Sequence, residues 1–427
     1  MLGGGTYIKQ NKVLPGAYFQ FISKATATSD LSERGVAAMA FDLNWGVDGA
    51  VFEVTAEEVR ENCLKIFGYD YSASEMKFIR ELFLHASTLY AYKLTSGGTK
   101  ATNDYATALC SGLRGNDLKV VIKSDVDEPS KFVVSLYFGT TKVDEQIVAS
   151  ASELVANDFV TWKQEAELVV TAGVALTGGT NGTSDTASHQ TFLNKIESFP
   201  NVNAIGYMGT DEPTKALYVA FTKRMRDEVG IKLQSVVHSH AGDSIACVNV
   251  KNQVDLVPWV TGVIAGTEVN KSATNMKYDG ELVVNTNYTQ KQLEAAIKAG
   301  EFILHQIGTE VHVLEDINSM VTTTTEQGEV FKDNQTVRVI DSIATSIANV
   351  FCSKYIGKVP NNESGRVSLW SDIVKLHQEL SDIQAIENFV SEDIEILQGN
   401  EKKTVVVNSA ITVVNTMTKL YMKTVVG

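Results

Sequence analysis

Two separated stretches of the chain share a pattern in which short apolar runs alternate with helical periods. The runs from Gly35 to Phe41 and from Asn203 to Met208 are typical of buried strands. Thr55-x-x-Glu58 and Ser72-x-x-Glu75 have the spacing of capping boxes, which predicts that a helix begins at each. The pattern predicts one α/β domain built around a single sheet, made of residues 23–95 and 184–288.

Between these two stretches the pattern changes to short β-type runs separated by turn residues. LKVVIK from Leu118 and KFVVSLYF from Lys131 have no helical period. Glycine-rich segments bracket the region, SGGT from Ser96 and TGGTNGT from Thr177. This indicates a β-rich domain, residues 96–183, inserted into the α/β domain.

The final third of the chain predicts an α+β unit. Glu301 to His305 and Glu310 to Leu314 are expected to form a hairpin, and a long helix is expected from about Gln335 to Tyr355. Apolar residues then recur at the spacing of an amphipathic helix, namely Leu369, Ile373, Leu376, Leu380 and Ile383. We assign residues 289–400 to a C-terminal α+β domain and residues 401–427 to C-terminal strands and an arm. The predicted fold class is therefore α/β and α+β multidomain, with extended terminal arms.

Both ends of the chain have β-type residues and no clear place in a self-contained core. Residues 1–22 lack a helical period and are interpreted as an extended arm. Thr416 to Val426 alternates and predicts a strand, with Leu420 and Met422 on one face and Tyr421 and Val425 on the other.

Composition and charge narrow the functional classes. The chain has 427 residues, of which 44% are hydrophobic, and no run of 18 apolar residues, which argues against a membrane-spanning helix. The formal net charge is −14 and there is no dense cluster of lysine and arginine, so wrapping of nucleic acid or insertion into anionic membranes is not expected. The first residues contain no apolar core of signal-peptide length, so we expect folding in the cytoplasm.

The inventory of catalytic residues is close to empty. His238 and His240 would share one face of a strand, with Asp243 nearby, which is the beginning of a metal site without an obvious third ligand. The glycine-rich segment from Thr177 lacks the Gly-Lys-Ser/Thr ending of a phosphate-binding loop. No Gly-x-Ser-x-Gly elbow is present. We therefore assign no catalytic, cofactor-binding or metal-binding residues and no cofactor. A cytoplasmic α/β enzyme with a nucleotide or metal site near His238 and His240 is one interpretation of these residues.

The order of short motifs along the whole chain resembles the tail sheath protein family of contractile phage tails, phage-tail-like bacteriocins and defective prophages. Leu14 and Ser319 depart mildly from the family pattern, at positions where a basic residue and a threonine are common. The motifs are Pro15-Gly16-Ala17-Tyr18, Arg34-Gly35-Val36-Ala37, Asn44-Trp45-Gly46, the glycine-rich stretch 176–182, the block 259–266 with Ser272-Ala273-Thr274-Asn275 and Tyr278-Asp279-Gly280, Glu315-Asp316-Ile317-Asn318-Ser319, Tyr355-Ile356-Gly357-Lys358 and Lys419-Leu420-Tyr421-Met422.

This resemblance implies a structural polymer without enzymatic activity. The enzyme is then the alternative interpretation, and a non-contractile scaffold is a third. Family members form six-fold helical rings around an inner tail tube and contract to drive the tube through a target envelope. The resemblance implies as partners other copies of the chain, the inner tube protein, and baseplate and tail terminator proteins, with assembly in the bacterial host cytoplasm and a final place in the released particle.

The resemblance also assigns roles to three groups of residues. Terminal arms of family members add strands to sheets of neighbouring subunits, which suits extended segments that need an open sheet edge. The expected inter-subunit residues of the N-terminal arm are Tyr7, Ile8, Val13, Pro15, Gly16 and Tyr18. Those of the C-terminal arm are Leu420, Tyr421, Met422 and Val425. The helix expected to face the tube carries Asp372, Lys375, Glu379 and Asp382.

Overall fold

The computed structural model describes residues 34–426, which divide into two compact units. The sheet unit comprises residues 34–342, 383–387 and 413–426. The helix–hairpin unit comprises residues 343–382 and 388–412. Each unit is described by itself below.

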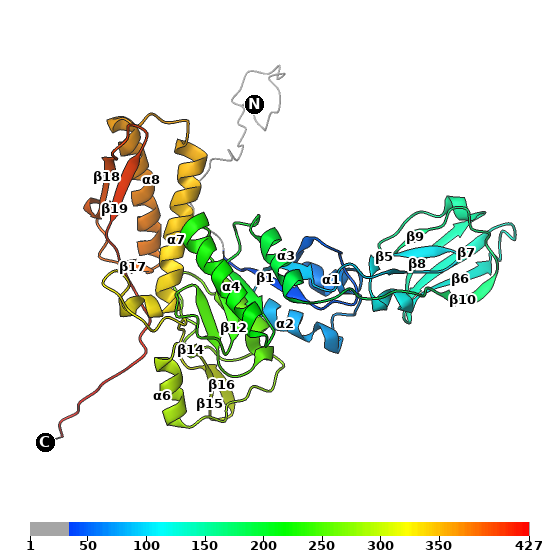
Figure 1. Ribbon diagram of the computed structural model, residues 1–427, viewed down its shortest axis with the longest axis horizontal. Coiled ribbons are helices and arrows are strands. Elements are labelled where there is room, and N and C mark those ends of the chain that lie inside the picture. The colour runs from blue at the N-terminus through cyan, green and yellow to red at the C-terminus, as the bar shows by residue number, and fades with distance from the viewer. Residues whose placement is uncertain (1–33, 427) are drawn as a thin grey trace, which may run out of the picture. The chain divides into compact units, whose positions relative to one another are not determined.

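A seven-stranded sheet lies at the centre of the sheet unit (Figure 1). Its strand order is β14-β13-β12-β11-β1-β3-β2, and all neighbours are parallel except β2 and β3. The sheet brings together strands on both sides of the inserted region, which confirms the prediction of a single α/β sheet. The strands are β1 (Val36–Phe41), β2 (Val51–Thr55), β3 (Thr88–Lys93), β11 (Ala204–Tyr207), β12 (Gln234–His238), β13 (Cys247–Val250) and β14 (Glu301–Phe302).

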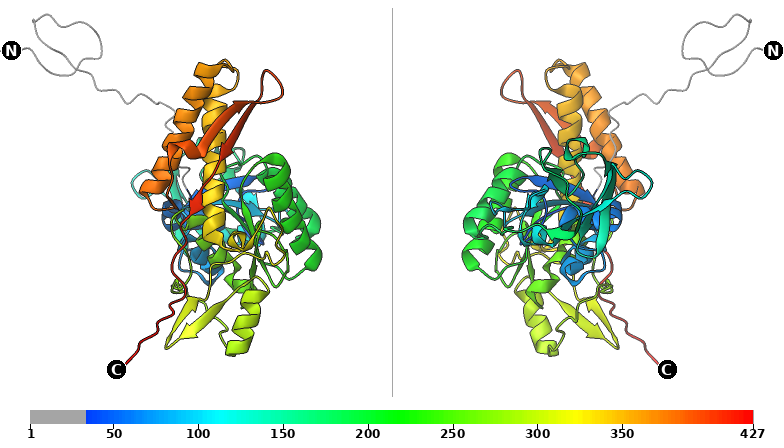
Figure 2. Two further views of the ribbon diagram at one scale, coloured as in Figure 1. Left: turned by 90° about the vertical axis from the view of Figure 1, so that its left-hand side faces the viewer. Right: turned by 90° about the vertical axis from the view of Figure 1, so that its right-hand side faces the viewer.

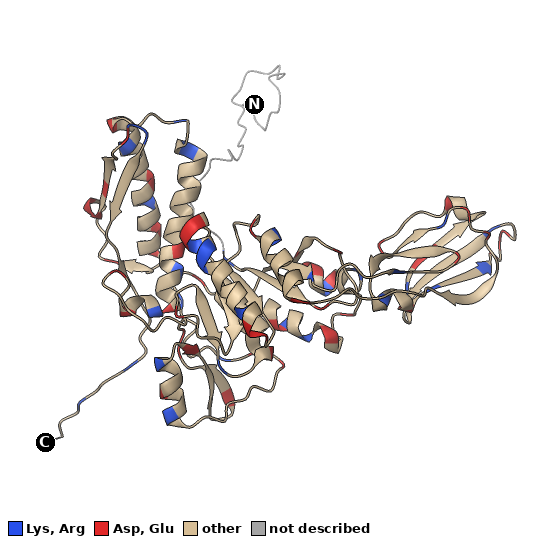
Figure 3. Ribbon diagram, viewed as in Figure 1, with Lys and Arg blue, Asp and Glu red and all other residues tan. Residues whose placement is uncertain are grey.

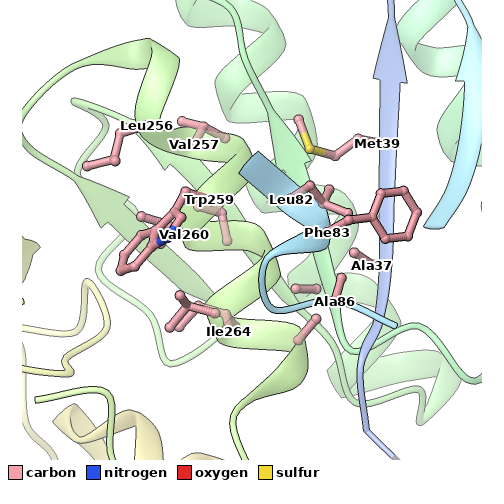
Figure 4. Close-up of a cluster of buried hydrophobic side chains, with 14 of the residues drawn as sticks. Ala37, Met39, Leu82, Phe83, Ala86, Leu256, Val257, Trp259, Val260 and Ile264 are labelled. Atoms are coloured by element: carbon pink, nitrogen blue, oxygen red, sulfur yellow. The ribbon is translucent and has the colours of Figure 1, made fainter. Parts of the chain in front are cut away.

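Helices cover both faces of this sheet. Alternate residues of β1 point to opposite faces and enter two different apolar clusters. Ala37 and Met39 belong to a cluster on one face, where Figure 4 shows Met39 close to Leu82 and Phe83. Ala38 belongs to a second cluster on the other face, together with side chains of α3 and α4. The helices of this unit are α1 (Ala56–Phe67), α2 (Lys77–Phe83), α3 (Thr186–Ile196), α4 (Glu212–Arg224), α5 (Val257–Gly266) and α6 (Gln290–Lys298), together with the first part of α7 (Asn334–Val350).

Local signals located some helix ends and misplaced one. The capping box of α1 is confirmed: Thr55 Oγ1 accepts from Glu58 N at 3.2 Å, and Thr55 N donates to Glu58 Oε2 at 2.9 Å. The predicted capping box from Ser72 is wrong, because α2 begins only at Lys77, after a 3₁₀ turn over Ser74–Met76. Glu75 accepts the hydroxyl of Ser74 at 2.9 Å, so its carboxylate bonds locally and does not cap from Ser72.

The inserted region is a sandwich of two small antiparallel sheets, as Figure 1 shows for the strands in cyan and green-cyan. Its core contains Val120, Leu136 and Trp162, which are buried. One sheet has the order β10-β6-β7-β8 and the other β4-β5-β9. The strands are β4 (Lys100–Thr102), β5 (Ala106–Ser111), β6 (Leu118–Ser124), β7 (Phe132–Phe138), β8 (Thr141–Val148), β9 (Val160–Trp162) and β10 (Thr171–Ala175).

The chain enters and leaves this sandwich through a narrow junction. Thr99 N donates to Thr180 Oγ1 at 3.1 Å, and Gly182 N donates to Thr95 O at 2.8 Å. A Cβ atom on Gly98 or Gly182 would overlap backbone atoms of the opposite segment, so only glycine permits this close approach. The two connecting segments therefore lie side by side.

A buried lysine fixes β3 to the first strands of the sandwich. The Lys93 side chain is completely buried, and its Nζ donates to Asp48 Oδ1 at 2.9 Å and to Ser111 O at 2.7 Å. Burial disfavours the charged form of Asp48, but hydrogen bonds from Ser111 and Lys93 outweigh it and lower the pKa of Asp48. The carboxylate therefore stays charged opposite the buried ammonium.

Residues after α6 extend the central sheet before they form a hairpin. Glu301 and Phe302, which the sequence pattern places within a hairpin, instead pair in parallel with Asn249 and Val250 of β13. The hairpin itself consists of β15 (Leu304–Ile307) and β16 (Glu310–Val313), with Gly308 at a φ of 63° in its turn. Within the described residues, no helix has both the length and the apolar character needed to cross a membrane.

The helix–hairpin unit contains the rest of α7, helix α8 (Glu363–Asp382) and a hairpin of β18 (Ile394–Gln398) and β19 (Val405–Ser409). Figure 2 shows the hairpin lying beside α8. Trp370 Nε1 of α8 donates to Ile394 O at 2.9 Å. Two-residue strands flank this unit in the sequence, β17 (Ile386–Glu387) and β20 (Thr412–Val413).

A completely buried carboxylate, Asp316, connects three segments of the sheet unit. It accepts hydrogen bonds from Ala273 N at 2.9 Å, from Asn334 Nδ2 at 3.0 Å and from Arg338 Nη2. Asn334 and Arg338 lie in the first turns of α7, so this carboxylate fixes the beginning of that helix. We call these residues the Asp316 cluster.

We expect the substitution Asp316→Asn to lower the free energy of unfolding by about 3–5 kcal/mol, because it leaves the buried Arg338 guanidinium without its counter-charge. Urea denaturation of the purified chain, followed by circular dichroism, measures the change. Glu315→Gln is the matched control, since Glu315 is the adjacent residue and its side chain is only partly buried. Equal losses in the two variants would contradict the role given to Asp316.

Candidate assembly surfaces

The C-terminal segment, residues 414–426, leaves the sheet unit in an extended form without regular secondary structure. Its first residues are held by the beginning of α7: Gln335 Nε2 donates to Val414 O at 3.0 Å, and Gln335 Oε1 accepts from Thr416 N at 3.1 Å. Asn415 bonds to the hydroxyl of Thr336 at 3.2 Å. We call these contacts the Gln335 clamp.

Beyond the clamp, the segment exposes apolar side chains almost completely. Exposed fractions reach 88% for Leu420, 90% for Tyr421, 80% for Met422 and 82% for Val425. Figure 3 shows that this end of the chain carries few charged residues. A run of exposed apolar side chains on an extended backbone marks a segment suited to contact with another surface.

The strand expected from Thr416 to Val426 is absent. Alternation of side chains indicates that a segment can form a strand, but a strand also needs a neighbouring edge to accept its backbone hydrogen bonds. Within the described part of the chain, residues 417–426 have no such neighbour.

The β18–β19 hairpin offers open edges. The two strands pair with each other from Ile394↔Ser409 to Gln398↔Val405, and no other described strand joins them. Each strand therefore has one side whose backbone groups lack a strand partner. Leu397, Val406 and Val407 are also exposed on this hairpin. Sequence reasoning predicted these strands but not their unpaired edges, since pairing partners cannot be read from a local pattern.

Helix α8 buries one face and exposes another. Leu369, Ile373, Leu376 and Leu380 are buried, as the predicted stripe requires. Ile383 is 36% exposed, because α8 ends at Asp382 before the stripe does. His377 is also buried, with Nδ1 2.8 Å from Ile373 O and Nε2 3.1 Å from Ser409 Oγ, and burial lowers its pKa.

The four charged residues expected to face the tube differ in their surroundings. Asp372 is partly buried and accepts the hydroxyl of Tyr355 at 2.7 Å, with Lys354 Nζ 3.3 Å away. Lys375 pairs with Glu379 at 3.3 Å one turn later on α8, and Asp382 is exposed at the helix end. Asp372 therefore has a structural partner, whereas the last three residues lie toward the C-terminal end of the helix.

The expected N-terminal arm residues, Tyr7, Ile8, Val13, Pro15, Gly16 and Tyr18, lie outside the described residues. Their assignment stays a prediction.

His238 and His240 have separate partners. Strand β12 ends at His238, and Ser239 takes a φ of 48°, so the strand alternation that would place both imidazoles on one face does not continue. His238 Nε2 is 3.2 Å from Ser239 Oγ, and His240 Nδ1 is 3.0 Å from Glu212 Oε2. Among residues 34–426, no group of three or more histidine, cysteine or acidic side chains is arranged to hold a metal ion. These contacts give no support to the enzyme alternative.

Comparison with known proteins gives matches along almost the whole chain. Four family models match consecutive parts of the chain: the tail sheath protein Gp18 domain III N-terminal region over residues 34–94, the phage tail sheath protein beta-sandwich domain over 96–181, the phage tail sheath protein central domain over 182–319 and the phage tail sheath C-terminal domain over 326–427. The phage-like element PBSX protein XkdK of Bacillus subtilis is 30% identical, over 98% of this chain and 99% of its own. The chain belongs to the phage tail sheath family.

Solved structures agree with this family. A sheath tail protein from Desulfitobacterium hafniense is 32% identical, with a TM-score of 0.83 over 95% of this chain and 99% of that one. A subunit of the contracted helical sheath of the anti-feeding prophage is 11% identical, with a TM-score of 0.56 over 97% of this chain and 99% of its own, and shares the fold. Membership of a structural family fits a non-enzymatic role for this sheath protein.

We expect Gln335→Ala to release the start of the C-terminal segment, because Gln335 supplies both a donor to Val414 and an acceptor for Thr416. Loss of these bonds, each worth about 0.5–1.5 kcal/mol, should speed hydrogen exchange at the Thr416 amide roughly tenfold. Exchange measured by mass spectrometry or NMR on the purified chain tests this. Gln290→Ala, on the exposed start of α6, is the control and should leave Thr416 unchanged; the same acceleration in both variants would refute the clamp.

Proposed function

We propose that this protein is the structural subunit of a contractile tail sheath, which polymerises as six-fold helical rings around an inner tail tube and contracts to drive the tube through a target cell envelope. The observation that carries the proposal is the coexistence of an exposed apolar C-terminal segment without a partner strand and a hairpin with unpaired edges. The segment lacks a sheet edge to pair with, and the hairpin edges lack a strand. In a polymer of identical copies, the segment of one copy can complete the hairpin of the next.

Strand addition suits a sheath that must change shape without coming apart. Backbone hydrogen bonds hold the added strand, and alternate side chains fix its register. Each bond contributes only about 0.5–1.5 kcal/mol, but several bonds per arm repeat over many subunits. Because the Gln335 clamp holds the base of the C-terminal segment in the sheet unit, a strand captured by a neighbour would link whole subunits.

We propose a division of labour along the chain. The arms, residues 1–22 and the end of residues 401–427, connect subunits. The α/β domain (23–95 and 184–288) and the inserted β-rich domain (96–183) lie toward the outside, and the C-terminal α+β domain (289–400) faces the tube. The proposed partners are further copies, the inner tail tube protein, and baseplate and tail terminator proteins. The subunit would assemble in the bacterial host cytoplasm and remain in the released tail or tail-like particle.

Removal of residues 417–427 should leave a folded subunit that does not build tubes, since the clamp and every described strand stay intact. Negative-stain microscopy scores tubes, and circular dichroism confirms folding. A matched variant keeps the segment but replaces Lys419 and Lys423 with glutamine, and it should still assemble.

Deletion of residues 1–18 should likewise abolish tubes. Normal tubes from both truncated forms would rule out strand exchange.

The double substitution Glu379→Lys with Asp382→Lys should weaken binding of the sheath subunit to pre-formed inner tubes. Exposed ion pairs contribute only about 0.2–1 kcal/mol each, but the loss repeats at every subunit around the tube. Co-sedimentation with purified tubes at low and high salt measures it. Asp372 is left unchanged because Tyr355 and Lys354 bind it within the fold.

The control for this double substitution is Glu57→Lys with Glu61→Lys on the exposed face of α1, which has the same charge change. Unaltered binding of the α8 variant, or equal losses in both variants, would show that this end of α8 is not the tube-facing surface.

A further inference from the structure

Three buried polar atoms on α7 have no hydrogen-bond partner in the described part of the chain: Nε and Nη1 of Arg338 and Oγ of Ser342. The Arg338 side chain is 1% exposed and that of Ser342 3%. The two residues are four positions apart on the helix, so they lie on one face of it. Buried donors without partners are rare and costly, so acceptors for these three groups are expected.

The acceptors have to belong to the folded chain. The three atoms have almost no accessible surface, so neither a dissolved ion nor solvent water reaches them. A void large enough for a trapped water would also leave them accessible. Because residues 34–426 supply no partner for these atoms, the part of the chain that precedes Arg34 is the source of acceptors to consider.

That part of the chain joins the described residues close to Arg338. Arg34 is the first described residue, and its side chain donates from Nη2 to Ile264 O at 2.7 Å and from Nε to Thr267 O at 3.1 Å. Arg338 Nη2 donates to Lys271 O at 2.8 Å. The two guanidinium groups therefore bind the same short stretch, the end of α5 and the turn after it.

The charges at this place leave one guanidinium group without a carboxylate. Asp341 accepts two hydrogen bonds from Arg226, at 2.7 and 2.6 Å. Asp316 accepts from Arg338, whereas Arg34 binds only carbonyl oxygens among the described residues. Burial and then the charge of Arg338 lower the pKa of Arg34 to about 9, so Arg34 is still charged at neutral pH. A segment that brings one more carboxylate would balance this charge.

Residues 1–33 contain two acidic side chains, Asp30 and Glu33. In an extended chain, residues two apart lie on the same side and adjacent residues on opposite sides. On an extended approach to β1, Asp30 would therefore share the side of Arg34, whereas Glu33 would point away from it. The four residues from Asp30 to Arg34 span at most about 14 Å, which keeps the carboxylate of Asp30 near the two guanidinium groups.

We propose that residues 29–33 bind along the face of α7 that carries Arg338 and Ser342, where the Asp30 carboxylate and carbonyl oxygens of the segment accept hydrogen bonds from the buried donors. Gln335, which holds the C-terminal segment, lies three residues before Arg338 on the same face of α7. Both terminal segments would then leave from one helix face. The docking itself needs no second copy, but its consequence, two arms that begin side by side, rests on the proposed function.

Hydrogen exchange of the purified full chain, read by mass spectrometry on peptides that cover residues 24–33, tests the docking. Exchange should be at least about tenfold slower than in a synthetic peptide of the same sequence. Asp30→Asn should speed it roughly tenfold, because charge-assisted hydrogen bonds become neutral ones. Ser342→Ala, which removes one neutral donor, should speed it by about threefold. Glu33→Gln is the matched control, since it makes the same change of charge three residues away and should exchange like the wild type.

Three results would overturn the docking: exchange of residues 24–33 at the rate of the free peptide, no effect of Asp30→Asn, or an effect of Glu33→Gln that is as large. Circular dichroism checks that each variant is folded. Negative-stain microscopy of the same preparations separates this proposal from the sheath role. Tubes formed by a chain with unprotected residues 24–33 would leave the sheath role standing without the docking, and protection in a chain that forms no tubes would support the docking alone.

Discussion

The structure depends on one buried carboxylate. Removing an ionised aspartate from water costs several kcal/mol unless charge and hydrogen bonds compensate it, and Asp316 obtains both from three separate segments. Arg338 is as deeply buried, and its Nε and Nη1 have no hydrogen-bond partner among the described residues, so the compensation is incomplete on the cationic side. Arg226 and Asp341 add a bidentate pair at 2.7 and 2.6 Å one turn further along α7. Because a buried charge without its partner is costly, these contacts favour the observed placement of the start of α7.

The direction of α7 matters for the rest of the molecule because two functional elements begin from it. The Gln335 clamp sets the point from which the C-terminal segment departs, and the far part of α7 opens the helix–hairpin unit. The unpaired hairpin edges and the exposed segment are both unfavourable in a lone subunit, one through backbone groups without strand partners and the other through apolar area in water. In the proposed sheath, the C-terminal segment of one copy would pair with a hairpin edge of the next copy, and both unfavourable features would be removed. The Asp316 cluster would then be the fixed part around which a flexible lattice is built.

Sequence reasoning found the features that depend on neighbouring residues. The capping box at Thr55 and the stripe from Leu369 to Leu380 follow local rules of residue spacing. It could not find the Asp316 cluster or the Gln335 clamp, because their partners lie far apart in the chain. It placed a strand at 416–426 because alternating side chains show that a segment can form a strand. They do not show whether a neighbouring sheet edge is present to pair with it. The family resemblance came from the order of many short motifs along the chain, each of which is weak evidence by itself.

The junction of the inserted sandwich has a consequence for how this architecture can vary. Thr95 to Thr99 and Thr180 to Gly182 are bonded to each other, so the excursion of the chain begins and ends at almost the same point. The span that a replacement must bridge is then that of a tight turn, and the entropy of closing it grows only slowly with length. A replacement module would still have to supply acceptors for the buried Lys93 of β3, because two of the hydrogen bonds from its Nζ go to Ser111 of the inserted region. The position of the insertion is thus open to changes of length, whereas its contact with the end of β3 is constrained by one buried side chain.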